Sequence, residues 1–234
     1  MVLHAGVLPR RLRRYQAHAR AEQIMGSNFI GVEEGLEISP FPIRPSVSFR
    51  LGRIPFSEGA LEMHRETHIL VAVLPVAVPS FLLVADERVS GLLSRTRRAQ
   101  GLWLDTPPPP GWHLVRKLPV KDSGGLNARE QRVLLKEGET VPDVEVAFYT
   151  ALAAATFLGE RIFVDGLLNR VRCASIPYES RRFGRTEITY DDAHTLGWDR
   201  VHETLGVGVF YKRTRRWWTG IASELKPEQL PRHW

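Results

Sequence analysis

The feature that most constrains the fold of this chain is one apolar run, Ile69 to Val78, which is nearly continuous and rich in β-branched residues. A run this short, interrupted by Pro75, cannot cross a bilayer as a helix. It is typical instead of a β-strand that is buried on both faces. The sequence therefore predicts a covered sheet, and the 234 residues of the chain are enough to cover it.

Capping and apolar patterns predict further helices and strands around this run. Helices are expected over about 58–65, 127–136 and 143–159, the first two capped by Ser57 and Asn127. In the second helix, Val133 and Leu134 are expected to face inward. The third is apolar around most of its circumference and is the predicted central helix. Strands are expected at 112–115, 171–176, 185–190 and 206–211, and one last helical turn at 223–228.

The fold class that follows is α+β, with a helical first half, a central helix and a C-terminal half rich in strands and loops. Charge divides the chain into a basic N-terminal arm (1–25), a single α+β domain (26–211) and a basic, Trp-containing tail (212–234). The net charge of +6 arises at the two ends, because residues 1–20 carry five arginines and no acid. Solvated termini and phosphate-binding arms are both compatible with this pattern.

Composition excludes several classes of protein. Cys173 is the single cysteine, so neither a disulfide scaffold nor a cysteine-ligated zinc site can form within the chain. Residues 1–20 lack the apolar core of a signal peptide, and no segment predicts a membrane span, so a cytoplasmic location is expected. We find no glycine-rich phosphate loop, dinucleotide fingerprint or nucleophile elbow. No cofactor is predicted.

Two histidines and the cysteine are candidates for chemistry. His64 and His68 could bind zinc from one face of a helix. A zinc protease would need a glutamate directly after the first histidine, where Arg65 stands, and a strand beginning near His68 is expected to part the pair. Cys173 could act as a nucleophile with His194 or His202 as base, although a cysteine in a predicted strand is usually a small buried hydrophobe. No metal site is predicted.

A second candidate is the basic pair Arg116 and Lys117, followed by Asp122 and Ser123. Arg116 could orient a carboxylate or phosphate through a bidentate contact. The alternative is an internal ion pair with Glu160 or Asp143.

A third candidate is a polar cluster between 191 and 203, which favours a solvated loop but could also recognise a ligand. The ligand-binding residues predicted there are Asp191, Asp192, His194, Trp198, Asp199, Arg200, His202 and Glu203.

Several segments together resemble one family. They include residues 23–34 (Gln-Ile-Met-Gly-Ser-Asn-Phe-Ile-Gly-Val-Glu-Glu), 67–75 (Thr-His-Ile-Leu-Val-Ala-Val-Leu-Pro), 112–120 (Trp-His-Leu-Val-Arg-Lys-Leu-Pro-Val), 139–142 (Glu-Thr-Val-Pro) and 159–163 (Gly-Glu-Arg-Ile-Phe). In order and spacing they resemble a family of uncharacterised bacterial proteins, over about 22–212. Some members look like target proteins of diversity-generating retroelements, so the resemblance implies a C-type-lectin-like C-terminal region that contacts a ligand through its loops.

The sequence thus predicts a non-enzymatic recognition protein that contacts a protein or small ligand through its C-terminal loops. The alternative is a protein that binds nucleic acid through its basic ends. The residues that would contact phosphates are Arg10, Arg11, Arg13, Arg14, Arg213, Arg215 and Arg216. A third hypothesis is a hydrolase or transferase built on His68, Asp122 and Arg116, which requires the first and last of these to share one cleft.

Overall fold

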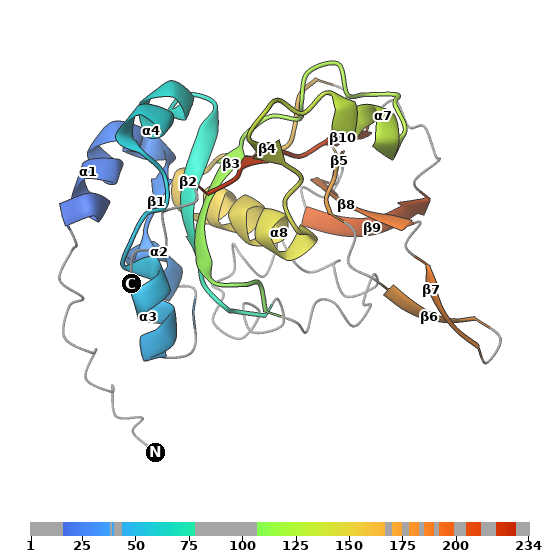
Figure 1. Cartoon of the computed structure of the whole chain (residues 1–234), viewed down its shortest axis with the longest axis horizontal. Helices are drawn as coiled ribbons and strands as arrows, with labels where there is room; N and C mark the ends of the chain where they lie inside the picture. The colour runs from blue at the N-terminus through green and yellow to red at the C-terminus, as the bar shows by residue number, and fades with distance from the viewer. Residues whose placement is uncertain are drawn as a thin grey trace.

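The arrangement of helices and strands in a computed structural model of the chain agrees with the α+β class in broad terms (Figure 1). The structure describes residues 16–37, 39, 44–77, 107–166, 170–174, 178–182, 185–189, 192–198, 205–211 and 219–227. For the strands between residues 178 and 211, the structure describes the backbone only. Among the described helices, none has the length and apolar character needed to cross a membrane.

The apolar run forms an interior strand of a five-stranded mixed sheet. The strands, in spatial order, are β1 (Phe29–Ile30), β2 (His68–Val73), β3 (Gly111–Arg116), β11 (Glu224–Leu225) and β4 (Glu139–Thr140). β1 is parallel to β2, and the other neighbours are antiparallel. Every residue of β2 is buried, which confirms a strand covered on both faces, whereas burial alternates along the first part of β3.

A second sheet is built from the C-terminal part of the chain. Its order is β10 (Thr219–Ile221), β5 (Arg170–Arg172), β8 (Asp192–Trp198) and β9 (Leu205–Tyr211). Beside it, β6 (Tyr178–Arg182) and β7 (Arg185–Thr189) form a two-stranded hairpin. The strands predicted near 171, 185 and 206 are confirmed as β5, β7 and β9, while β6 and β8 were not predicted.

Helices cover both faces of the five-stranded sheet. Figure 1 shows the N-terminal helices on one side of β2 and β3, and α8 on the other, between the two sheets. The N-terminal helices are α1 (Gln16–Met25), α2 (Val32–Glu37), α3 (Pro45–Leu51) and α4 (Glu58–His64), and a 3-10 turn, η1 (Gly26–Asn28), follows α1. The first half thus holds these helices together with the two expected strands, β2 and β3, and the short strand β1, which was not predicted.

The predicted central helix is α8 (Val144–Ala153), which contacts β2, β3 and β8. All its residues are buried, which confirms the expectation drawn from its apolar circumference. A π-helical turn, η4 (Ala154–Leu158), extends it, and Gly159 ends it with a φ of 66°. This left-handed conformation is one that glycine adopts at little steric cost.

The helix predicted after Asn127 is shorter than expected. α7 (Ala128–Val133) begins with a complete capping box between Asn127 and Glu130. Its inward positions are Ala128 and Gln131, three residues apart, so Val133 points away from the core and is 79% exposed. The prediction that Val133 faces inward was therefore wrong.

The segment from Thr219 to Leu225 connects the two sheets. β10 pairs with β5, and two residues later β11 lies between β3 and β4. The amide of Ala222 donates to the carbonyl of Arg172, and the amide of Arg116 donates to the carbonyl of Ser223. The helical turn predicted at 223–228 was wrong, because backbone pairing on both sides holds Glu224–Leu225 extended. This part of the expected tail belongs to the sheets.

Candidate functional site

Polar side chains gather where β2 begins and β3 ends. His68 is the first residue of β2, and its register partner is Arg116, the last residue of β3. Antiparallel pairing produces this juxtaposition, since the start of one strand lies beside the end of the next. The third hypothesis drawn from the sequence required these two residues to come together, and at the level of strand register they do.

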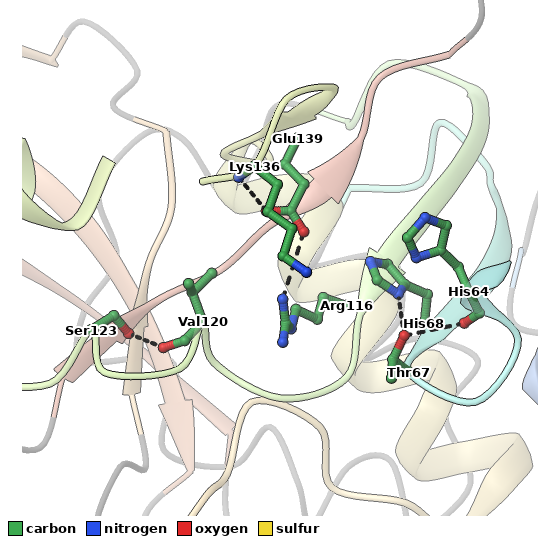
Figure 2. A network of polar contacts seen from close by, with 8 residues as sticks. All are labelled: His64, Thr67, His68, Arg116, Val120, Ser123, Lys136 and Glu139. Carbon is green, nitrogen blue, oxygen red and sulfur yellow. Dashed lines mark hydrogen bonds and ion pairs between the residues drawn. The ribbon is translucent and has the colours of Figure 1, made fainter. Parts of the chain in front are cut away.

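His64 and His68 are also adjacent. α4 ends at His64, and the chain turns through Arg65–Thr67, with the amide of Thr67 donating to the carbonyl of His64 at 3.0 Å. The two imidazole centroids are 4.6 Å apart in an edge-to-face arrangement. The expectation that the strand would part the histidines was wrong, because this turn folds the first residue of β2 back beside the end of α4 (Figure 2).

His68 is the buried member of the pair, with 2% of its surface exposed. Its Nδ1 lies 2.8 Å from the hydroxyl of Thr67, whereas its Nε2 is buried and makes no hydrogen bond. Burial, together with the charges of His64, Arg116 and Lys136, lowers the pKa of His68 to about 3. The ring is therefore neutral at physiological pH.

His64 is half-buried, and its environment is mixed. Burial lowers its pKa, the carboxylate of Glu139 raises it, and the cations Lys136 and Arg116 lower it. These three charged groups therefore lie within electrostatic range of the ring. Residues from α4, β2, β3 and the segment that enters β4 thus meet in one place.

Glu139 is the carboxylate of this cluster. Its Oε2 accepts a hydrogen bond from the amide of Lys136 at 2.9 Å, and its Oε1 lies 3.6 Å from Nη1 of Arg116. The first contact fixes the carboxylate on its own turn, where Gly138 has a φ of 83°. The second is longer than a hydrogen bond, so the contact between Arg116 and Glu139 is an ion pair.

The side chain of Lys136 extends toward the guanidinium of Arg116 in Figure 2, with the ring of His68 lying between Arg116 and His64. In the part of the chain that the structure describes, the ammonium of Lys136 has no carboxylate within 4 Å. We call His64, His68, Arg116 and Lys136, together with Glu139, the basic cluster. Its formal charge with neutral imidazoles is +1, from two cations and one carboxylate.

Lys117 has a different, structural role. Its ammonium lies 2.7 Å from Oε2 of Glu160 and 3.0 Å from Oδ1 of Asn28. Asn28 in turn donates to the carbonyl of Arg65 at 2.6 Å. The internal ion pair with Glu160 considered from the sequence is therefore confirmed, and it is formed by Lys117 rather than Arg116.

The turn at Asp122 and Ser123 also serves the fold. The buried hydroxyl of Ser123 donates to the carbonyl of Val120 and accepts from the amide of Ile221. Asp122 is exposed at a φ of 62°, and among the described contacts none joins it to His68 or Arg116. The predicted catalytic set is thus assembled only in part.

The ligand-binding residues predicted between 191 and 203 do not form one loop. Asp192, His194 and Trp198 are alternate positions of β8, which pairs with β5 on one side and β9 on the other. Backbone pairing over residues 192–198 overrides the polar composition that suggested a loop. The other predicted residues lie outside the described part of the chain: Asp191, Asp199, Arg200, His202 and Glu203, and likewise Arg10, Arg11, Arg13, Arg14, Arg213, Arg215 and Arg216.

Cys173 follows β5 and belongs to the hydrophobic core, with 3% of its surface exposed. This confirms the expectation of a small buried hydrophobe. Among the described residues, no group of three or more histidine, cysteine and acidic side chains could hold a metal ion.

Sequence reasoning had named three members of the basic cluster but missed Lys136 and Glu139. Glu139 reaches Arg116 because β4 and β3 both pair with β11, and Leu225 lies opposite Glu139 on one side and Leu114 on the other. No local pattern signals this arrangement, since it depends on pairing between segments far apart in the chain. The chain matches no protein-family model, no curated protein and no solved structure, so the family resemblance stays a prediction.

Proposed function

We propose that this chain is a recognition protein that binds an anionic ligand through its basic cluster. The observation that carries the proposal is the surplus of cations in the cluster, where Arg116 and Lys136 lie with one carboxylate, Glu139, beside the two imidazoles. The surplus positive charge favours an anion over a neutral ligand.

The chemistry of the cluster supports binding in preference to catalysis. Arg116 offers a planar set of N–H donors, and Lys136 offers a mobile ammonium, which together are the usual partners of carboxylates and phosphates. Asp122, the third member of the catalytic hypothesis, stands apart from both His68 and Arg116 among the described contacts. The described side chains thus supply charge and donors at one place.

Recognition through the C-terminal residues stays a separate prediction, and so does nucleic-acid binding through the basic ends. Both place their contacts on residues other than the basic cluster. A ligand bound at the basic cluster is therefore distinguished from either by variants of Lys136, which leave the predicted C-terminal and terminal contacts intact.

The test is isothermal titration of the full chain with inorganic phosphate, sulfate, acetate and citrate at pH 7 and low salt. We expect saturable binding of at least one anion, weakened about tenfold or more by Lys136→Gln, since a hydrogen bond to a charged group contributes about 1.5–3 kcal/mol. The matched control is Lys121→Gln, which removes the same charge from an exposed turn. If none of the anions binds, or if both variants weaken binding equally, the proposal is wrong.

A further inference from the structure

The outer face of α3 combines an exposed aromatic side chain with arginines. Phe49 is 85% exposed, the highest value among the exposed large hydrophobic side chains of the described residues. Arg50 follows it directly, and Ser46 lies one helical turn before it. Gly52 keeps a right-handed helical backbone, with a φ of −65° and a ψ of −17°, so Arg53 continues the same side. Ser46, Phe49, Arg50 and Arg53 are all exposed, and we call them the α3 face.

The opposite side of α3 is fixed to the body of the protein. Val47 and Leu51 are buried in the hydrophobic core, and Pro45 opens the helix. From β3, the indole N–H of Trp112 donates to the carbonyl of Leu51 at 2.9 Å. A partner that contacts Phe49 therefore meets a backbone that is already ordered, which lowers the entropic cost of binding.

The charge around the α3 face has one sign. Residues 38–57 contain three arginines, Arg44, Arg50 and Arg53, and no acidic residue. None of the three forms an ion pair among the described residues. The first acidic residue after the segment, Glu58, is already paired with an arginine of α1 at 2.9 Å. Cations that the chain itself does not neutralise attract a polyanion.

Single-stranded nucleic acid fits this combination of an aromatic ring and arginines better than a membrane does. An exposed ring offers a stacking surface for a base, and guanidinium groups beside it bind the adjacent phosphates. A helix that lies in a membrane surface presents a continuous apolar face. On the α3 face, polar and charged side chains flank Phe49 instead. The bases of a duplex are stacked on one another, so a single strand is the better partner.

We propose that the α3 face binds single-stranded nucleic acid, with a base stacked on Phe49 and with Arg50 and Arg53 on neighbouring phosphates. The residues of this site are distinct from the basic cluster, so the inference goes beyond the proposed function and does not depend on it. They are also distinct from the arginines of the two ends of the chain.

The first test measures stacking by fluorescence anisotropy of a labelled strand with the full chain at pH 7 and low salt. The probes are an oligothymidylate of about twelve nucleotides and an abasic strand of the same length, which keeps the phosphates and lacks the bases. We expect the oligothymidylate to bind about fivefold or more tightly than the abasic strand. Phe49→Leu removes the ring and should abolish most of this difference. Met63→Leu, at an exposed position of α4, should retain it. An oligouridylate of the same length shows whether RNA is preferred to DNA, and tight binding of either supports the proposal.

The second test measures the phosphate contacts by salt dependence. Each phosphate contact to a single strand contributes about 0.7 to the slope of log K against log salt concentration. Arg53→Gln should therefore make the slope less steep by about 0.7. The matched control is Arg132→Gln, which removes the same charge from an exposed position of α7, at the opposite end of the molecule from α3 (Figure 1). This variant should leave the slope unchanged.

Several outcomes would overturn the proposal. It is wrong if the abasic strand binds as tightly as the oligothymidylate, or if Phe49→Leu and Met63→Leu behave alike. Binding that is weakened by Lys136→Gln and not by Phe49→Leu would place the strand on the basic cluster instead. If neither strand binds but vesicles of phosphatidylcholine and phosphatidylserine do, the α3 face contacts a membrane and the assignment to nucleic acid is wrong.

Discussion

Acid is expected to destabilise this protein through His68. Burial holds the folded-state pKa of His68 at about 3, against the ordinary value of 6.5, and the charges of His64, Arg116 and Lys136 act in the same direction. Because the unfolded chain takes up the proton at higher pH than the folded chain, protonation favours unfolding. The effect is absent above the unfolded-state pKa, begins as the pH falls through 6.5, and grows until the pH reaches about 3.

The size of the effect follows from the two pKa values. At pH 5 the unfolded-state imidazole is almost fully protonated and the folded-state imidazole almost fully neutral. This difference corresponds to a free-energy loss of about 2 kcal/mol. Small domains have a total free energy of unfolding of about 5–15 kcal/mol, so the loss is measurable by urea denaturation.

The variant His68→Gln removes the titrating group. We expect the free energy of unfolding of the wild type to fall by about 2 kcal/mol more than that of the variant between pH 7.5 and pH 5. Glu66→Gln, an exposed change on the neighbouring turn, is the control and should follow the wild type. Equal losses in the wild type and His68→Gln would refute the argument that His68 is buried and neutral.

Three further predictions concern stability and are all measurable by urea denaturation. Burial raises the pKa of Glu145 to about 7, with a smaller contribution from Asp143 and against the effect of a hydrogen bond to its own backbone. The free energy of unfolding of the wild type should therefore fall by about 3 kcal/mol relative to that of Glu145→Gln as the pH rises from 4.5 to 8. A difference that stays constant with pH would contradict this. Ser57→Ala removes the N-cap bond from the amide of Ala60 and should cost about 1 kcal/mol, whereas Ser46→Ala, on an exposed position of α3, should cost less than about 0.5. Leu114→Ala should cost about 2–5 kcal/mol because the side chain is fully buried, whereas Val133→Ala should change stability by less than about 0.5; similar costs would show that Val133 is covered.

Features set by neighbouring residues were predictable from the sequence. Ser57 and Asn127 cap their helices as expected, because a capping side chain bonds to amides only two or three positions away. The run beginning at Ile69 forms a buried strand because its composition suits no exposed surface. The apolar circumference of α8 likewise required a position between two layers.

Features set by distant pairing were not predictable in the same way. Residues 224–225 have a composition that favours a helical turn, yet they form β11 because β3 and β4 offer backbone partners on both sides. β8 similarly holds Asp192 and His194 in a strand, although acidic and polar residues suggested a loop. In both cases the hydrogen bonds that decide the conformation come from segments far along the chain.

The basic cluster was predictable from the sequence only in part. His68 is the polar residue that precedes the buried run of β2, and Arg116 is the first charged residue after the apolar part of β3. Each marks the end of an apolar stretch, where a polar or charged side chain follows or precedes the strand core. Once two such strands are paired antiparallel, the polar start of one must lie beside the polar end of the other. Polar residues that bound adjacent buried strands are therefore the signal that could have located this cluster, and a distant carboxylate such as Glu139 then joins it through the next strand of the sheet.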